Sequence, residues 1–329
     1  MSFPRRAFLG AGLLAALALP ALAQQRPPLP DPALTQGIRI CAGGARGNYT
    51  FAANEIAQRV GKADFPGGVR VITTGGSLDN LRRLEAGECD IGLAQSDVTT
   101  MFLAERAGAP EALVPFSKLY EEVVHVLCPV ASGWEDIGDM GAASATRSGA
   151  RLIVGPDGSG GAETWRAMRQ ADPKTFDRVQ RLPNDVGRAS LGMVRDSNNT
   201  CMLWVSGLNS ADMQSADTMS IMNPNKRPTM RLVDVNKSGI RNLRAPNGEP
   251  MYRVRSVTRE QASGNNPGLY GNLIPSGWLS AGSVDALAVD ALLIMRADFR
   301  ASLGARADGL MQAIDDASPT IWARVQPRR

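Results

Sequence analysis

Short apolar runs alternate with segments of helical periodicity along the chain from residue 38 onward. A continuous apolar or β-branched run predicts a buried strand, and apolar residues three or four positions apart predict a helix. The β-α-β-α-β-α order that results is typical of a parallel sheet with helices on both faces. Ser77 follows two glycines and is expected to cap the second helix. The elements predicted for this first part are strands over 38–41, 69–73 and 90–94 and helices over 50–60, 77–87 and 97–106.

The alternation resumes after an apolar, β-branched run at 123–128 and builds a second unit of the same kind. A further long apolar run, 286–295, follows this unit and precedes a terminal helix, which indicates that the chain returns to the first domain. We therefore expect an α/β protein of two lobes, 37–129 with 281–329 and 130–280, each a mostly parallel sheet flanked by helices. The elements predicted for the second unit are strands over 152–154, 179–182 and 202–205 and helices over 163–170 and 189–194.

The N-terminal 23 residues have the pattern of a cleavable signal peptide. Arg5 and Arg6 precede an apolar run, and Ala21-Leu22-Ala23 supplies the small residues of a cleavage site. A membrane helix is the competing interpretation, but the run is short for an apolar core of about 30 Å and meets Pro20. The arginine pair fits both the twin-arginine and the general secretory route. We expect a periplasmic protein that begins with an extended, proline-rich lead-in over 24–36 and has no lipid anchor, since no cysteine lies near the cleavage site.

Composition and charge add little to this picture. The chain of 329 residues is 43% hydrophobic and 21% charged, as globular proteins are, and its net charge of +4 goes with a sequence pI of about 9.0. Without Arg5 and Arg6, 34 basic residues face 32 acidic ones, which leaves +2. A charge this small does not indicate a nucleic-acid partner.

The four cysteines are spaced too widely for a metal or redox motif of the Cys-x-x-Cys kind. In an oxidising compartment they allow up to two disulfides with three possible connectivities. Each also lies in or beside an apolar run, where a free thiol packs as a small core residue. We expect buried thiols rather than bridges at Cys41, Cys89, Cys128 and Cys201.

The loops after the predicted strands carry the candidate binding residues. In such sheets ligands bind at the carboxyl ends of the strands, where helix N-termini offer free N–H groups. Glycine-rich turns also occur in any α/β protein because of their backbone geometry, so the signal lies in four such loops together. Backbone amides and hydroxyls converging from both lobes favour a small carboxylate as ligand. The residues are Gly44, Arg46, Asn48, Tyr49, Thr74, Gly75, Ser77, Gln95, Ser96, Gly158, Ser159 and Gly160.

Catalytic and nucleotide-binding motifs fit the sequence poorly. The glycine-rich segment at 155–161 lacks the lysine of a phosphate-binding loop, and no G-x-G-x-x-G, G-x-S-x-G or H-E-x-x-H motif occurs. The one histidine, His125, lies in an apolar run and is expected in the core. Acid–base chemistry by Asp97 or Glu121 stays open, although nothing in the sequence pairs with either. We expect no enzyme activity, no cofactor and no metal.

Five blocks of this sequence resemble, in order and spacing, the TAXI family of solute-binding proteins, the extracytoplasmic receptors of some TRAP (tripartite ATP-independent periplasmic) transporters. The resemblance implies a type II periplasmic-binding-protein fold with two hinge crossovers, and a ligand such as glutamate, glutamine, an oxo-acid or a dicarboxylate. It also implies delivery to a membrane-embedded TRAP permease. Family members bind ligand through the strand-end loops named above. The blocks are 40–49, 73–81, 87–97, 119–126 and 154–160.

Three departures from the family pattern concern the site. Arg46 stands where the family is usually small or neutral, and 201–209 lacks the family's Gly-x-Pro, while 223–266 is long and polar. Two other functions stay open: a periplasmic enzyme on the same fold, and a sensory binding protein that has no permease. We expect a monomer in which Ser77 and the amides of 158–160 hold carboxylate oxygens, Tyr49 covers the aliphatic part and Arg46 adds a charge.

Overall fold

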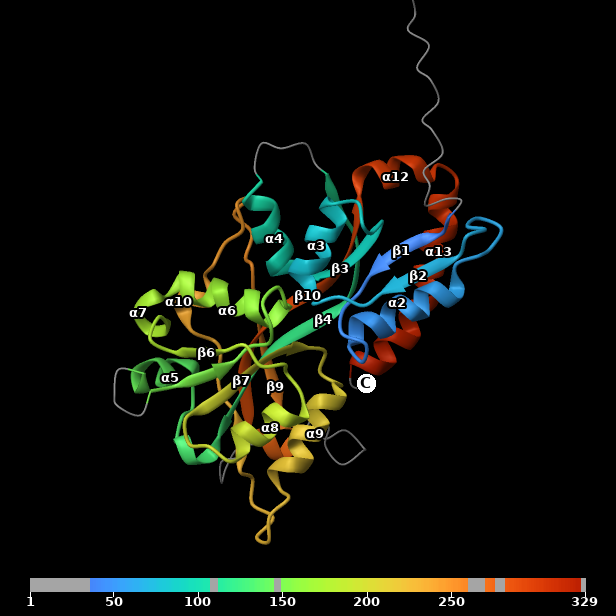
Figure 1. Ribbon diagram of the computed structural model, residues 1–329. Helices are drawn as coiled ribbons and strands as arrows, with labels where there is room; N and C mark the ends of the chain where they lie inside the picture. The colour runs from blue at the N-terminus through green and yellow to red at the C-terminus, as the bar shows by residue number, and fades with distance from the viewer. Residues whose placement is uncertain (1–35, 107–111, 145–148, 260–269, 276–281, 327–329) are drawn as a thin grey trace, which may run out of the picture.

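One mixed β-sheet runs through the whole molecule and joins two lobes (Figure 1). The computed structural model describes residues 36–106, 112–144, 149–259, 270–275 and 282–326. The predicted signal peptide, 1–23, and nearly all of the lead-in, 24–36, lie outside the described residues. The order of the strands is β2-β1-β3-β10-β4-β7-β5-β6, with β8 on β4 and β9 on β10.

The first lobe is built from both ends of the described chain. Its parallel strands pair in the order β2-β1-β3, and the C-terminal helix packs on the helix that follows β1. Its elements are β1 (Ile38–Cys41), α2 (Asn48–Arg59), β2 (Val69–Ile72), α3 (Ser77–Glu85), β3 (Ile91–Gln95), α4 (Ser96–Ala104), α12 (Ala297–Leu303) and α13 (Arg306–Val325).

The second lobe repeats the plan with parallel strands in the order β7-β5-β6. Its elements are η1 (Val130–Ser132), α5 (Ile137–Ala143), β5 (Arg151–Ile153), α6 (Gly160–Ala171), α7 (Pro173–Phe176), β6 (Gln180–Leu182), α8 (Arg188–Arg195), β7 (Thr200–Ser206), α9 (Ala211–Ser220), β8 (Met230–Leu232), α10 (Ser238–Arg241), β9 (Arg253–Thr258) and η2 (Gly271–Leu273).

Two long antiparallel strands, β4 (Leu113–Pro129) and β10 (Ser283–Arg296), pass from one lobe to the other. In β4 the residues up to Tyr120 pack in the first lobe's core, and those from Val123 pack in the second. In β10 the change falls between Val289 and Ala291. The strands therefore cross between the lobes at Glu121 and Glu122 in β4 and at Asp290 in β10. These charged residues lie close to a shift of register between Ala291 and Leu292 of β10.

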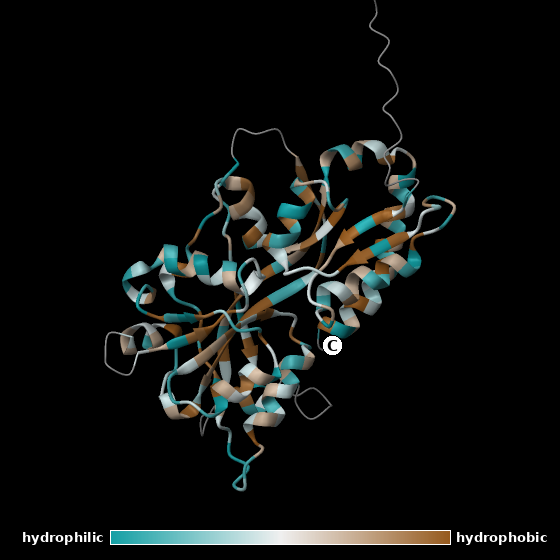
Figure 2. Cartoon of the chain, in the orientation of Figure 1, coloured by the Kyte–Doolittle hydropathy of each residue, from teal (hydrophilic) through white to brown (hydrophobic). Residues whose placement is uncertain are grey.

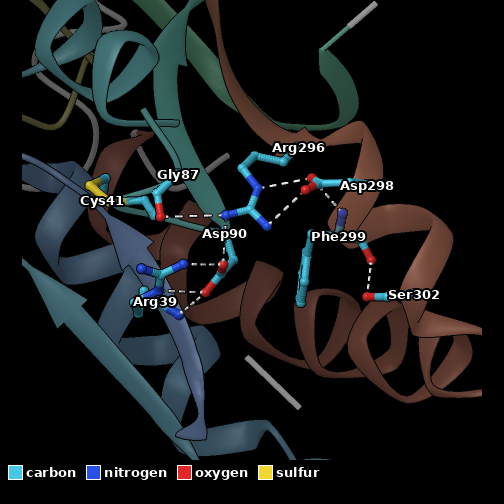
Figure 3. A network of polar contacts seen from close by, with 9 residues as sticks. Arg39, Cys41, Gly87, Asp90, Arg296, Asp298, Phe299 and Ser302 are labelled. Carbon is cyan, nitrogen blue, oxygen red and sulfur yellow. Dashed lines mark hydrogen bonds and ion pairs between the residues drawn. A yellow bond between two sulfur atoms is a disulfide. The ribbon is translucent and has the colours of Figure 1, made fainter. Parts of the chain in front are cut away.

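A buried ion-pair network fastens β1, β3 and β10 in the first lobe (Figure 3). Asp90 has no solvent exposure, and its carboxylate accepts from the Arg39 Nε at 3.1 Å and the Arg39 backbone N–H at 2.8 Å. The guanidinium of Arg296, at the end of β10, lies 3.5 Å from the same carboxylate and also binds Asp298. Since Asp90 immediately precedes β3, its one carboxylate ties three strands together.

Each lobe also contains a disulfide, so the expectation of free thiols was wrong. Cys41, at the end of β1, is bonded to Cys89, just before β3. Cys128 in β4 is bonded to Cys201 in the neighbouring strand β7. Apolar surroundings fit a thiol and a disulfide equally well, and only the pairing of the strands brings each pair of cysteines together.

The predicted α/β architecture is confirmed, and most predicted strands and helices match observed ones to within a few residues, but β4 begins at Leu113 rather than at 123 and β9 was not predicted. Hydrophobic residues follow the strands, and polar residues lie on the outer faces of the helices (Figure 2). Ser77 is not the helix cap: Gly76 caps α3, and Ser77 is its first residue. Within the part of the chain described, no helix is both long and apolar enough to cross a membrane.

Candidate functional site

The loops that precede α3 and α6 meet between the lobes. The backbone N–H of Leu78, in the first turn of α3, donates to the carbonyl oxygen of Gly158 at 3.1 Å. Gly76 has φ of 118°, and a Cβ there would lie 3.4 Å from the Cα of Ser159. Two of the predicted binding loops, one from each lobe, are therefore in direct contact.

Gln95, the last residue of β3, lies beneath this contact. It is 2% exposed, and its backbone N–H donates to the Ser77 hydroxyl at 3.2 Å. A Cβ on Gly160 would overlap the Gln95 side-chain amide, so that a larger residue there requires the amide to move. The Gln95 Oε1 atom is buried and accepts no hydrogen bond from any described residue. An orphaned carbonyl oxygen thus lies among the predicted ligand contacts, where a ligand donor would satisfy it.

Tyr49, which is half-buried, and Glu122, which is buried, form a hydrogen-bonded pair beside Ser77. The Tyr49 hydroxyl donates to Glu122 Oε2 at 2.7 Å and also lies within hydrogen-bonding range of Ser77. Burial raises the pKa of Glu122 to about 8, with the charges of Asp97 and Asp290 adding to the effect. Burial and the nearby Glu122 likewise hold the Tyr49 pKa well above its usual value. At neutral pH Glu122 is mostly protonated in this arrangement.

Asp97, at the start of α4, is a second buried acid at the junction. Its carboxylate accepts from the Thr164 hydroxyl of α6 at 2.8 Å and from the Tyr252 hydroxyl at 3.0 Å, both in the second lobe. The Val98 N–H is a third donor, at 2.9 Å. Burial raises the Asp97 pKa even though all three hydrogen bonds favour the anion. Asp97 therefore links the lobes through hydrogen bonds rather than through an ion pair.

A second contact between the lobes lies at the end of α13. The backbone N–H of Asn209, just before α9, donates to the carbonyl oxygen of Val325 at 2.9 Å. Arg46 is exposed, and its charge lowers the pKa of Asp212 in the first turn of α9, against the larger upward effect of burial. Arg46 thus faces the second lobe across the junction.

The structure gathers half of the predicted residues around the contact of the two loops and places the other half outside it. Tyr49, Ser77, Gln95, Gly158, Ser159 and Gly160 come together as described. The other six have different contacts: Arg46 acts on Asp212 as described, Gly44 accepts from Thr50, Asn48 accepts from Arg324, Thr74 donates to Asn80, Gly75 donates to Asp79, and Ser96 accepts from the Asp290 N–H.

Four residues of the junction were absent from the predicted site: Glu122, Asp97, Thr164 and Tyr252. A signal existed for Glu122, because Glu121-Glu122 interrupts an apolar strand and neighbouring strand residues point to opposite faces. One of the two glutamates had to face a packed surface. No comparable signal marks Tyr252, which lies 155 residues from its partner Asp97.

A separate hollow of about 470 Å³ lies along α6 and α7, and no predicted site residue lines it. Three arginines line it, but carboxylates already neutralise them: Arg166 pairs with Glu163 at 2.7 Å, and Arg169 pairs with Asp177 at 3.0 Å. Arg181 pairs with Asp157 in the same way. Among the described residues no group of three or more potential ligands is placed to hold a metal ion. The junction of the lobes is therefore the better candidate site.

Two α/β lobes, a pair of antiparallel crossing strands and strand-end loops that meet between the lobes define the type II periplasmic-binding-protein fold, as predicted. The model of the NMT1-like family matches residues 40–172, which span most of the first lobe's parallel unit and the start of the second lobe. Among curated proteins, none matches the sequence significantly.

Solved structures superpose on this chain at low sequence identity. A protein from Bordetella bronchiseptica RB50 superposes with a TM-score of 0.51 and 14% identity, over 88% of this chain and 75% of that one. MatC from Rhodopseudomonas palustris, solved with bound malate, gives a TM-score of 0.48 and 12% identity over 88% of each chain. The alkanesulfonate-binding protein SsuA from Xanthomonas axonopodis pv. citri, bound to MOPS, gives a TM-score of 0.43 and 14% identity over 87% of this chain and 74% of that one. At such identities the likeness concerns the fold alone.

Proposed function

We propose that this protein is a periplasmic solute receptor of the TAXI class, which closes on a small organic acid and delivers it to a TRAP permease. Glutamate, glutamine, oxo-acids and dicarboxylates are the candidate ligands. The contact between the loops that open α3 and α6 carries the proposal, because it brings an N–H group of the first turn of α3 against the loop of the opposite lobe. A ligand carboxylate would take the position on α3 that the Gly158 carbonyl holds here.

The hinge of this receptor lies in the two crossing strands. We place it at Glu121 and Glu122 in β4 and at Asp290 in β10, where the packing passes from one core to the other. The lobes would then divide within these strands rather than at residues 129 and 281. Opening about the hinge separates Leu78 from Gly158 and Asn209 from Val325, and a bound carboxylate then joins the two lobes in place of the direct hydrogen bond from Leu78 to Gly158.

A thermal-shift screen over amino acids, oxo-acids and dicarboxylates tests the proposed function. A ligand at a hundred times its Kd adds about 2.7 kcal/mol to the free energy of unfolding, which raises the Tm measurably. No shift with any compound would refute a receptor for small organic acids. An absorbing cofactor in the purified protein would instead support an enzyme.

The role of Arg46 is tested separately, because its charge acts on Asp212 in the second lobe but Arg46 is not among the residues gathered at the contact of the two loops. If Arg46 binds the ligand, Arg46→Ala weakens an acidic ligand by about 1.5 to 3 kcal/mol, the range for hydrogen bonds to charged groups. Arg70→Ala, at an exposed arginine of β2, is the matched control. Equal calorimetric affinities of the two variants would remove Arg46 from the site.

A further inference from the structure

Four acids lie at or beside the hinge, and Glu122 is the one with the fewest partners. Asp290 pairs with Lys118 at 2.7 Å and with Arg253 at 2.6 Å, and Glu121 pairs with Arg253 at 3.3 Å. Asp97 has the three hydrogen-bond donors described above. Glu122 has the Tyr49 hydroxyl, and within the described part of the chain it forms no ion pair.

The surroundings of Glu122 favour the arrival of a donor. A carboxylate offers about four acceptor positions, and one hydroxyl fills one of them. The titratable groups that act on Glu122 from the elements around it are Tyr49 of α2, Asp97 of α4 and Asp290 of β10, and none of them supplies a positive charge to it. The charge of Arg324 in α13 is felt at the neighbouring Tyr120. A buried carboxylate anion without a neighbouring cation destabilises the folded protein, unless the carboxylate is protonated or a cation binds to it.

Glu122 also lies where the predicted ligand contacts meet. Its partner Tyr49 reaches Ser77, and Ser77 accepts from Gln95, whose side-chain oxygen is itself an orphaned acceptor. Glu122, with one hydrogen-bond donor, and Gln95 Oε1, with none among the described residues, are thus both linked to Ser77, the first through Tyr49 and the second through its own backbone N–H. A ligand that brings several N–H donors on one atom satisfies both.

We propose that Glu122 is a specificity-determining residue that receives the ammonium group of the ligand and selects amine-bearing acids over oxo-acids and dicarboxylates of the same size. The assignment rests on the proposed function and narrows its ligand class. In this assignment the two ends of the ligand bind different groups. The carboxylate binds the helix N-termini, and the ammonium group binds Glu122 and Gln95.

The assignment has a consequence for protons. Glu122 is mostly protonated at pH 7 in the ligand-free protein, because burial raises its pKa to about 8. An ammonium group requires the anionic form, so binding at pH 7 releases close to one proton into the buffer. An oxo-acid or a dicarboxylate gives no such release at this residue.

The test is isothermal titration calorimetry on the protein purified after export, with ligands matched in carbon skeleton. The pairs are L-glutamate with 2-oxoglutarate, L-aspartate with oxaloacetate, and L-alanine with pyruvate. The wild type is expected to bind one amine-bearing member about ten- to a hundredfold more tightly than its oxo counterpart, as a charged hydrogen bond allows. In Glu122→Gln, which keeps an acceptor for Tyr49, this ratio falls toward one. Glu55→Gln, at an acid of α2 that pairs with Arg59 outside the hinge and the predicted site, is the control and keeps the wild-type ratio.

Proton release is measured on the wild type alone, in phosphate and Tris buffers at pH 7, so it does not depend on the folding of a variant. Equal or tighter binding of the oxo-acids would overturn the assignment, and so would an unchanged ratio in Glu122→Gln or binding of the amine without proton release. Absence of binding by every acid of the thermal-shift screen has a different meaning, because it refutes the receptor function itself.

Discussion

Asp90 is predicted to hold the first lobe together, and Asp90→Asn tests this. The substitution removes the one negative charge that Arg39 and Arg296 share in a site without solvent exposure. Removing one partner of a buried ion pair costs about 3 to 5 kcal/mol, because the remaining charges lose their compensation. The Arg39 side chain is 30% exposed, so water restores part of its solvation and the lower figure applies. We expect a loss of about 3 kcal/mol in the free energy of unfolding.

The assay is thermal unfolding followed by circular dichroism, in which about 3 kcal/mol corresponds to a Tm roughly 6 to 12 °C lower. Asp298→Asn is the matched control, because Asp298 binds the same Arg296 but its side chain is 74% exposed (Figure 3). An exposed pair contributes under about 1 kcal/mol. If Asp90→Asn lowers the Tm no more than Asp298→Asn does, burial of the shared carboxylate is not what stabilises the three strands.

Three further predictions follow from the disulfides, the buried histidine and the contact between the lobes. The unreduced protein, denatured in guanidinium, should show no thiol that reacts with Ellman's reagent. The bridges close loops of 48 and 73 residues, and each adds roughly 4 kcal/mol to the free energy of unfolding, so reduction should lower the Tm. Detection of free thiols would contradict both bridges. Burial lowers the His125 pKa to about 4, so the unfolded chain takes up the proton first as the pH falls. The wild type should lose up to about 3 kcal/mol of stability between pH 6.5 and pH 4. His125→Phe should remove this acid-side loss, and an unchanged pH profile in urea titrations would show that His125 is not its source. Gly160→Ala places a methyl group against Gln95 and should hold the lobes apart, giving a larger radius of gyration in X-ray scattering. Gly192→Ala is the control, because a Cβ on Gly192 has open space around it, and this variant should keep the wild-type radius of gyration. Equal radii of the two variants would count against a tight contact at Gly160.

Local patterns of the sequence were enough for most of the elements and for the choice of loops. Strands such as Ile38–Cys41 are short apolar runs between glycines or polar residues, and the periodicity of the helices is equally local. The strand β9 was missed because Arg253–Thr258 is mostly exposed on a sheet edge and forms no apolar run. The strand β4 was predicted too short for a similar reason, since Pro115 and the polar pair Ser117-Lys118 break up the apolar residues of its first half.

What the tertiary structure decided concerns residues far apart in the chain. The pairing of β4 with β7 brings Cys128 to Cys201, and no local property distinguishes a bridged cysteine from a buried thiol. The alternation of side chains along β4 required Glu121 and Glu122 to face opposite sides. Only the surrounding elements decided that Arg253 neutralises Glu121 and that Glu122 is buried against Tyr49. The periodicity of the sequence indicates which residues are buried when the chain folds. The pairing of charges depends on contacts between distant residues, which form only in the folded protein.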